Sequence, residues 1–194
     1  MKKDLGLLSL LAALLAIAAS VAVRRALLTL PNASNPLADW SPRQCAIAFA
    51  IALIAFIASI IAIAVSDRGL VHPSAELEWV YARDEAARIV SDYDREQQRM
   101  QAVRGVVLDS VAFIPSYVAL IAIACFALRQ PAIGWCAILA GALDYVENGG
   151  IFAVLGGITT RLAPLTYAAC QLKWLLALGA ADFAVITFVM RYVR

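Results

Sequence analysis

The feature that most constrains the fold of this chain is a series of apolar runs, each about as long as a lipid bilayer is thick. A helix needs about 20 consecutive apolar residues to cross roughly 30 Å of hydrocarbon. Such runs occur at about 5–23, 44–65, 106–128, 133–155 and 164–190. They are continuous, whereas a membrane β-barrel would show alternating segments of about ten residues. The sequence therefore predicts an all-α, polytopic transmembrane helical bundle with five spans.

Composition and charge argue against several other classes of protein. Hydrophobic residues make up 63% of the 194 residues and charged residues 15%, whereas about a quarter of the residues in soluble domains are charged. The formal net charge of +2 is small and no basic patch is present, which argues against nucleic-acid binding. The single histidine, His72, argues against a histidine-based metal site. We expect no metal and no cofactor.

The cysteines occur singly within apolar runs and form no CxxC pair. This pattern predicts small buried hydrophobic residues and argues against disulfides or metal ligands. The four positions are Cys45, Cys125, Cys136 and Cys170.

The chain divides into three parts by hydropathy. Residues 1–65 hold two apolar spans, residues 66–105 form a charged segment, and residues 106–194 hold three spans that carry polar side chains. The first run follows a basic start and resembles a signal peptide, but it is long enough to span, so we expect it to be retained.

The charged segment predicts an amphipathic helix outside the membrane. It contains six arginines and eight acidic residues, so strong attraction to anionic lipid is not expected. Its apolar residues fall roughly on one helical face: Leu77, Tyr81, Ile89, Tyr93 and Met100. Such a helix would lie on the membrane surface or on the bundle. It would act as a connecting helix or as a docking surface for a partner.

Polar residues interrupt the fourth run near its centre. Asp144, Glu147 and Asn148 are three and four positions apart, so they share one face of a helix. An ionised side chain at mid-membrane costs about 2.5–3.5 kcal/mol, and hydrocarbon offers no water to relieve it. These residues therefore need partners within the bundle.

The depth of each polar residue follows from the rise of about 1.5 Å per helical residue. Asp144, Lys173 and Tyr117 lie on three consecutive runs, at about 14–16 Å from the same end. This predicts an ion pair between the fourth and fifth spans, with a hydrogen bond from Tyr117. Glu147 is one turn shallower, and the sequence does not decide which of the two carboxylates pairs with Lys173.

Two further acidic residues lie in the last three runs. Asp109 is shallower, at about 5 Å, and is predicted to pair with Arg104 or Arg161 at the membrane boundary. Asp182 lies towards the far face, and no partner is predicted for it.

Three interpretations of this polar set remain open. It could be structural, fixing the register of the helices. It could bind a small lipid-like ligand, and the protein could then be an enzyme in which Asp144 or Glu147 acts as a general acid or base. It could line a proton- or ion-coupled transport path, which would require a homo-oligomer because three helices are few to enclose a path.

The last three runs resemble an uncharacterised family of small bacterial multi-pass membrane proteins. The resemblance covers about residues 89–178 and rests on these motifs: Leu108-Asp109, Phe113-Ile114, Tyr117, Leu143-Asp144, Glu147-Asn148 and Lys173. It implies that the last three spans are the functional unit and implies nothing about a substrate.

The distribution of basic residues predicts the orientation. With five spans the termini lie on opposite faces, and the face of the amino terminus collects nine Lys or Arg residues against six on the other. The positive-inside rule therefore favours a cytoplasmic amino terminus in a bacterial inner membrane.

Overall fold

The computed structural model describes residues 34–192, and every regular element in this part of the chain is helical. The elements are α2 (Pro42–Ser66), η1 (Ser74–Trp79), α3 (Arg83–Arg95), α4 (Arg99–Leu108), η2 (Asp109–Phe113), α5 (Ile114–Ala127), α6 (Pro131–Leu155) and α7 (Ala163–Tyr192). The predicted all-α class is confirmed.

Within residues 34–192, four helices are long and apolar enough to cross a membrane. They are Pro42–Ser66, Arg99–Ala127, Pro131–Leu155 and Ala163–Arg191. These helices are compatible with an integral membrane protein. The predicted count of five is not confirmed, because the first predicted span, 5–23, lies outside the described residues.

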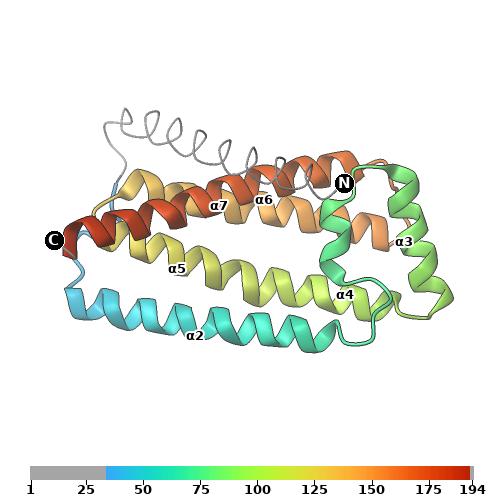
Figure 1. The fold of residues 1–194 in the computed structure, drawn as a ribbon, viewed down its shortest axis with the longest axis horizontal. Coiled ribbons are helices and arrows are strands. Elements are labelled where there is room, and N and C mark those ends of the chain that lie inside the picture. The colour runs from blue at the N-terminus through green and yellow to red at the C-terminus, as the bar shows by residue number, and fades with distance from the viewer. Residues whose placement is uncertain (1–33, 193–194) are drawn as a thin grey trace, which may run out of the picture.

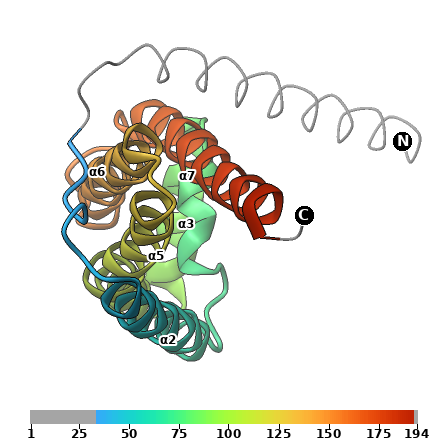
Figure 2. The ribbon, with the colours of Figure 1, turned by 90° about the vertical axis from the view of Figure 1, so that its left-hand side faces the viewer.

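The four long helices run side by side and α3 crosses one end of them (Figure 1). In the end view, α5 lies between α2 and α6, and α7 lies against α6 (Figure 2). The bundle therefore has one end covered by η1 and α3, and an opposite end where α2 begins and α7 ends.

The outer surface of α2 is apolar, as expected of a helix that faces lipid. Ser41 and Gln44 form a capping box at its start. Ile51 and Ile54 are 63% and 68% exposed. The isoleucine-rich sequence thus forms a helix that buries few of its side chains within the bundle. On the inner face, the Ser59 and Ser116 hydroxyls lie 3.3 Å apart and join α2 to α5.

The third span begins earlier than the predicted position 106, because α4, η2 and α5 continue into one another. η2 is a π-helical turn in which the backbone N–H of Ile114 donates to the carbonyl of Asp109. Pro115 follows at the start of α5. A proline removes one ladder hydrogen bond, and the wider turn before it absorbs the change in register.

The charged segment is not the single amphipathic helix that the sequence predicts. It divides into η1, α3 and the first part of α4, because Val80 is extended and Gln97 has a φ of 56°. One face of α3 packs on the bundle, with Ile89 and Tyr93 fully buried. Tyr81 and Met100, predicted on the same face, are 64% and 67% exposed because the breaks rotate them away.

Close approach of α6 to its neighbours brings the polar side chains within reach of one another. A Cβ on Gly141 would lie 2.5 Å from the Val118 side chain of α5. On the other side, Gly150 faces the Thr166 side chain of α7 without room for a methyl group. Both glycines therefore allow the helix contacts that position the site.

Candidate functional site

The centre of the candidate site is Lys173, which is 4% exposed in the middle of α7. Its Nζ lies 2.7 Å from Asp144 Oδ1 and 2.8 Å from Glu147 Oε2. The predicted ion pair between α6 and α7 is therefore present, and the choice between Asp144 and Glu147 that the sequence left open is resolved as contact with both. The lysine also contacts the second carboxylate, because Asp144 and Glu147 stand one turn apart on the same face of α6.

Tyr117 completes the bonding of Asp144. The tyrosine hydroxyl donates to Asp144 Oδ2 at 3.0 Å, and Lys173 donates to Asp144 Oδ1. Both oxygens of this carboxylate are bonded, and Asp144 is only 2% exposed. The hydrogen bond predicted from the common depth of these residues is confirmed.

Glu78 is a member of the site that the sequence analysis missed. It lies on η1, outside the spans, and its Oε2 is 3.3 Å from Lys173 Nζ. Its side chain is 13% exposed, so it connects the buried lysine to the surface of the bundle. We call Lys173 with its three carboxylates and the tyrosine the Lys173 cluster: Glu78, Tyr117, Asp144, Glu147 and Lys173.

A local signal for Glu78 is present in the sequence. The glutamate stands within the otherwise apolar stretch 77–81, and its neighbours Leu77 and Val80 are each 4% exposed. An acidic residue in such a stretch indicates a buried partner. Burial raises the pKa of the Glu78 carboxyl, and the Lys173 ammonium opposes that rise.

Asn148 and Asp109 form a second polar group further along α6. Asn148 Nδ2 donates to Asp109 Oδ2 at 2.6 Å and to Ser110 Oγ at 2.9 Å. The predicted pairing of Asp109 with Arg104 or Arg161 is wrong within residues 34–192. Both arginines are exposed, while η2 turns Asp109 towards α6.

Asp182, for which the sequence predicts no partner, lies exposed on α7. It is not part of the Lys173 cluster. The residues predicted as site candidates thus fall into two bonded groups, one around Lys173 and one around Asn148.

Glu147 differs from the other acidic residues of the cluster in how it is bonded. It is fully buried, yet within residues 34–192 neither of its carboxylate oxygens accepts a hydrogen bond of normal geometry. The 2.8 Å approach of Lys173 Nζ to Oε2 is therefore an ionic contact without hydrogen-bond alignment. Buried carboxylates normally accept several hydrogen bonds, so Glu147 keeps unused acceptor capacity.

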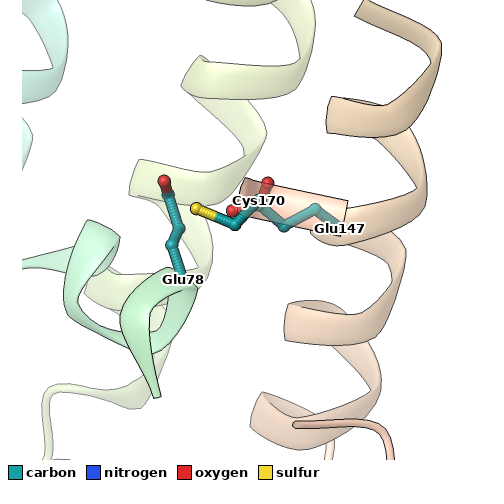
Figure 3. Close-up of side chains that lie close together, drawn as sticks. All are labelled: Glu78, Glu147 and Cys170. Carbon is teal, nitrogen blue, oxygen red and sulfur yellow. The ribbon is translucent and has the colours of Figure 1, made fainter. Parts of the chain in front are cut away.

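The sulfur of Cys170 lies beside this carboxylate. The ligand atoms of Glu78, Glu147 and Cys170 all lie within 4.8 Å of one another (Figure 3). We call these three residues the thiol–carboxylate group. Cys170 is fully buried, as the sequence predicts, but its thiol faces acidic groups as well as apolar side chains.

The charges of the Lys173 cluster do not balance when all groups are ionised. One ammonium lies within 3.3 Å of three carboxylates. Among residues 34–192 no second cationic side chain forms an ion pair with Glu78, Asp144 or Glu147. If all three carboxylates are ionised, the cluster carries a net negative charge in a place largely closed to water, and uptake of a proton or of another cation would remove it.

The comparisons with known proteins do not add an activity. No protein-family model, curated protein or solved structure matches this chain. The resemblance to a bacterial membrane family stays a prediction. The functional conclusion depends on the geometry of the Lys173 cluster.

Proposed function

We propose that this chain is an integral membrane protein that binds a cation at the Lys173 cluster, as a small cation-coupled transporter does. The observation that supports this most directly is one lysine shared by three carboxylates. Burial of uncompensated charge is costly, because low-dielectric surroundings disfavour the ionised form. A bound cation supplies the missing positive charge.

Glu78 supports access to this site from one end of the bundle. It belongs to a segment outside the spans, and its side chain is partly exposed while it contacts Lys173. A cation arriving from the η1 end would therefore meet Glu78 first and Glu147 next. Transport across the membrane would also need a path from the cluster to the opposite end of the bundle. We expect that several copies of the chain, assembled as a homo-oligomer, would form this path.

A lipid-like ligand or an acid–base enzyme has less support from the geometry. Both oxygens of Asp144 are occupied by Tyr117 and Lys173. Asn148 is bonded to Asp109 and Ser110. Such mutual bonding leaves few polar groups free to recognise an organic ligand, whereas the excess charge remains available to a cation.

The test is the thermal stability of the purified protein in detergent across a panel of monovalent and divalent cations. A cation that binds only the folded state at 100 times its Kd adds about 2.7 kcal/mol of stability. We expect at least one cation to raise the melting temperature of the parent protein. Glu147→Gln should abolish this rise, because it removes the charged group with unused acceptor capacity.

Glu85→Gln is the matched control, because Glu85 is an exposed acid on α3 away from the cluster. It should respond to cations as the parent does. Reconstituted vesicles then test transport, with cation uptake lost in Glu147→Gln and kept in Glu85→Gln. If no cation stabilises the parent protein, or if Glu147→Gln responds equally, the proposal is wrong.

A further inference from the structure

The thiol–carboxylate group narrows the class of cation, and this inference rests on the proposed function. We propose that Glu78, Glu147 and Cys170 bind a divalent transition-metal ion of the zinc class. The group brings together one residue each from η1, α6 and α7. Figure 3 shows these side chains directed towards a common point from their separate elements.

The separations are close to those of a metal site. Zinc binds thiolate sulfur at about 2.3 Å and carboxylate oxygen at about 2.0–2.2 Å. Tetrahedral angles then place the ligand atoms about 3.6 Å apart. The three ligand atoms here lie within 4.8 Å of one another, so closure by about 1 Å, within the reach of side-chain rotation, completes the site.

Glu147 provides an observation that is independent of this proximity. It is fully buried, its Oε2 is paired only ionically with Lys173 at 2.8 Å, and within the described part of the chain its Oε1 accepts no hydrogen bond. Its carboxylate belongs to the group that includes Cys170 and Glu78. A metal ion would use this free acceptor capacity, which a purely structural ion pair would satisfy by hydrogen bonds.

The donor set favours zinc-class metals over calcium and magnesium. Calcium and magnesium prefer a shell of oxygen ligands alone, and here one of three donors is sulfur. A site with one thiolate ligand, two carboxylate ligands and an open fourth position suits zinc and its neighbours in the first transition row. Three protein ligands with an open position also allow faster exchange than a closed four-ligand site.

Binding follows a simple balance of charge and protons. The thiol of Cys170 must lose its proton to solvent when it becomes a ligand, because the thiolate is the form that binds metal. The metal replaces the Lys173 ammonium as the counter-charge of Glu147 and of Glu78, both of which contact that ammonium in its absence. Lys173 then keeps its 2.7 Å contact with Asp144. No oxidant or reductant takes part.

The experiment uses cobalt(II) as a spectroscopic substitute for zinc, added to the purified full chain in detergent. A cobalt–thiolate bond gives a charge-transfer absorption that cobalt in water lacks. We expect this band in the parent protein, its loss on addition of zinc, and its absence in Cys170→Ser. Cys136→Ser is the control, because it removes another buried cysteine, on α6 and outside the group.

A second variant keeps the test decisive if Cys170→Ser does not fold. Glu78 lies at the partly exposed edge of the group, and Glu78→Gln should weaken cobalt binding at least tenfold. The wavelength of the cobalt–thiolate absorption should not change, because Cys170 still supplies the sulfur. A thiolate band that persists in Cys170→Ser overturns the metal assignment. So does a parent protein that forms no band, or unchanged cobalt affinity in Glu78→Gln.

The two proposals fail in different ways. If monovalent cations stabilise the parent protein through Glu147 while neither cobalt nor zinc binds, the metal assignment is wrong and cation binding stands. If no cation of any class stabilises the parent protein, both proposals are wrong.

Discussion

At the scale of single residues, Lys173 is the side chain on which most of the buried charge depends. Its Nζ contacts carboxylates from two separate elements, η1 and α6. Removing one partner of a buried ion pair leaves the others uncompensated, which typically costs about 3–5 kcal/mol.

We therefore expect Lys173→Ala to lower the free energy of unfolding by about 3–5 kcal/mol. Arg88→Ala is the control, because the Arg88 side chain is 58% exposed and its ion pairs, with Glu85 and Asp92, lie on α3 away from the cluster. Its cost should stay below about 1 kcal/mol. Denaturant titration in detergent measures both. Equal stability of Lys173→Ala and the parent would contradict a central role for this lysine.

Tyr117 is expected to contribute less than the lysine but measurably. Tyr117→Phe removes the hydroxyl that donates to Asp144 at 3.0 Å and leaves the ring in place. Hydrogen bonds to charged groups contribute about 1.5–3 kcal/mol, so a loss in this range is expected in the same titration. Tyr81→Phe, at a 64% exposed tyrosine, should change stability little. Similar losses in both variants would mean that the bond to Asp144 contributes nothing specific.

At the scale of elements, the position of η1 decides whether Glu78 reaches Lys173. Asp67 Oδ2 accepts hydrogen bonds from the Ser74 backbone N–H and hydroxyl at 2.9 and 2.8 Å. Ser74 packs against Gly105 of α4, where an added Cβ would lie 2.6 Å from Ser74 Oγ. This fit leaves no space for a side chain between α4 and η1.

Gly105→Ala is therefore expected to displace η1 and to destabilise the protein by about 1–3 kcal/mol, as overpacking does. The matched control is Gly149→Ala on α6, where an added Cβ meets nothing within 4 Å. That variant should be neutral or slightly stabilising, because alanine favours a helix by about 1 kcal/mol over glycine. Thermal unfolding in detergent compares the two, and equal melting temperatures would contradict the close fit.

A histidine between η1 and α3 makes their contact dependent on pH. His72 lies 3.0 Å from Asp92 and 2.8 Å from Glu76. Arg88 and Arg95 also contact Asp92. The hydrogen bond to Asp92 is the main reason that the pKa of His72 is raised, with a smaller contribution from Glu76, while burial opposes the rise.

Because the folded-state pKa is raised, the stability that His72 contributes is complete below its unfolded value of about 6.5. It is lost as pH rises through the higher folded value. Unfolding measured from about pH 6 to about pH 9 should show this loss in the parent. His72→Gln should show a smaller decline. The same decline in both proteins would assign the pH dependence to other groups.

At the scale of the whole molecule, the arrangement of spans fixes which segments share a side of the membrane. The start of α2 and the end of α7 lie at one end of the bundle, and η1 and α3 lie at the other (Figure 1). The positive-inside expectation, made from the sequence, places the η1 and α3 end in the cytoplasm.

Cysteine labelling with a membrane-impermeant maleimide tests this orientation. Arg129→Cys, between α5 and α6, should react in intact cells. Glu96→Cys, at the end of α3, should react only after the membrane is opened. The parent protein is the control for its native thiols, of which Cys125, Cys136 and Cys170 are buried and Cys45 is half-buried. The reverse pattern would overturn the orientation.

The long apolar runs made the helical class and the positions of α2, α6 and α7 predictable, because each run satisfies the bilayer constraint on its own. The contacts of Asp144 with Lys173 and with Tyr117 were also predictable, because depth along a helix follows from residue count. The contact with Glu78 was not, since 95 residues separate it from Lys173. Nor was the early start of the third span, which depends on the π-helical turn at η2.

The contact between Glu78 and Lys173 has one more consequence for the molecule. It makes η1, a segment outside the spans, a direct neighbour of a side chain placed deep in the bundle. A change in the charge or position of Lys173 is therefore expected to change how firmly that segment is held. Protease sensitivity between η1 and α3 would then report the interior state from outside, with no label inside the bilayer.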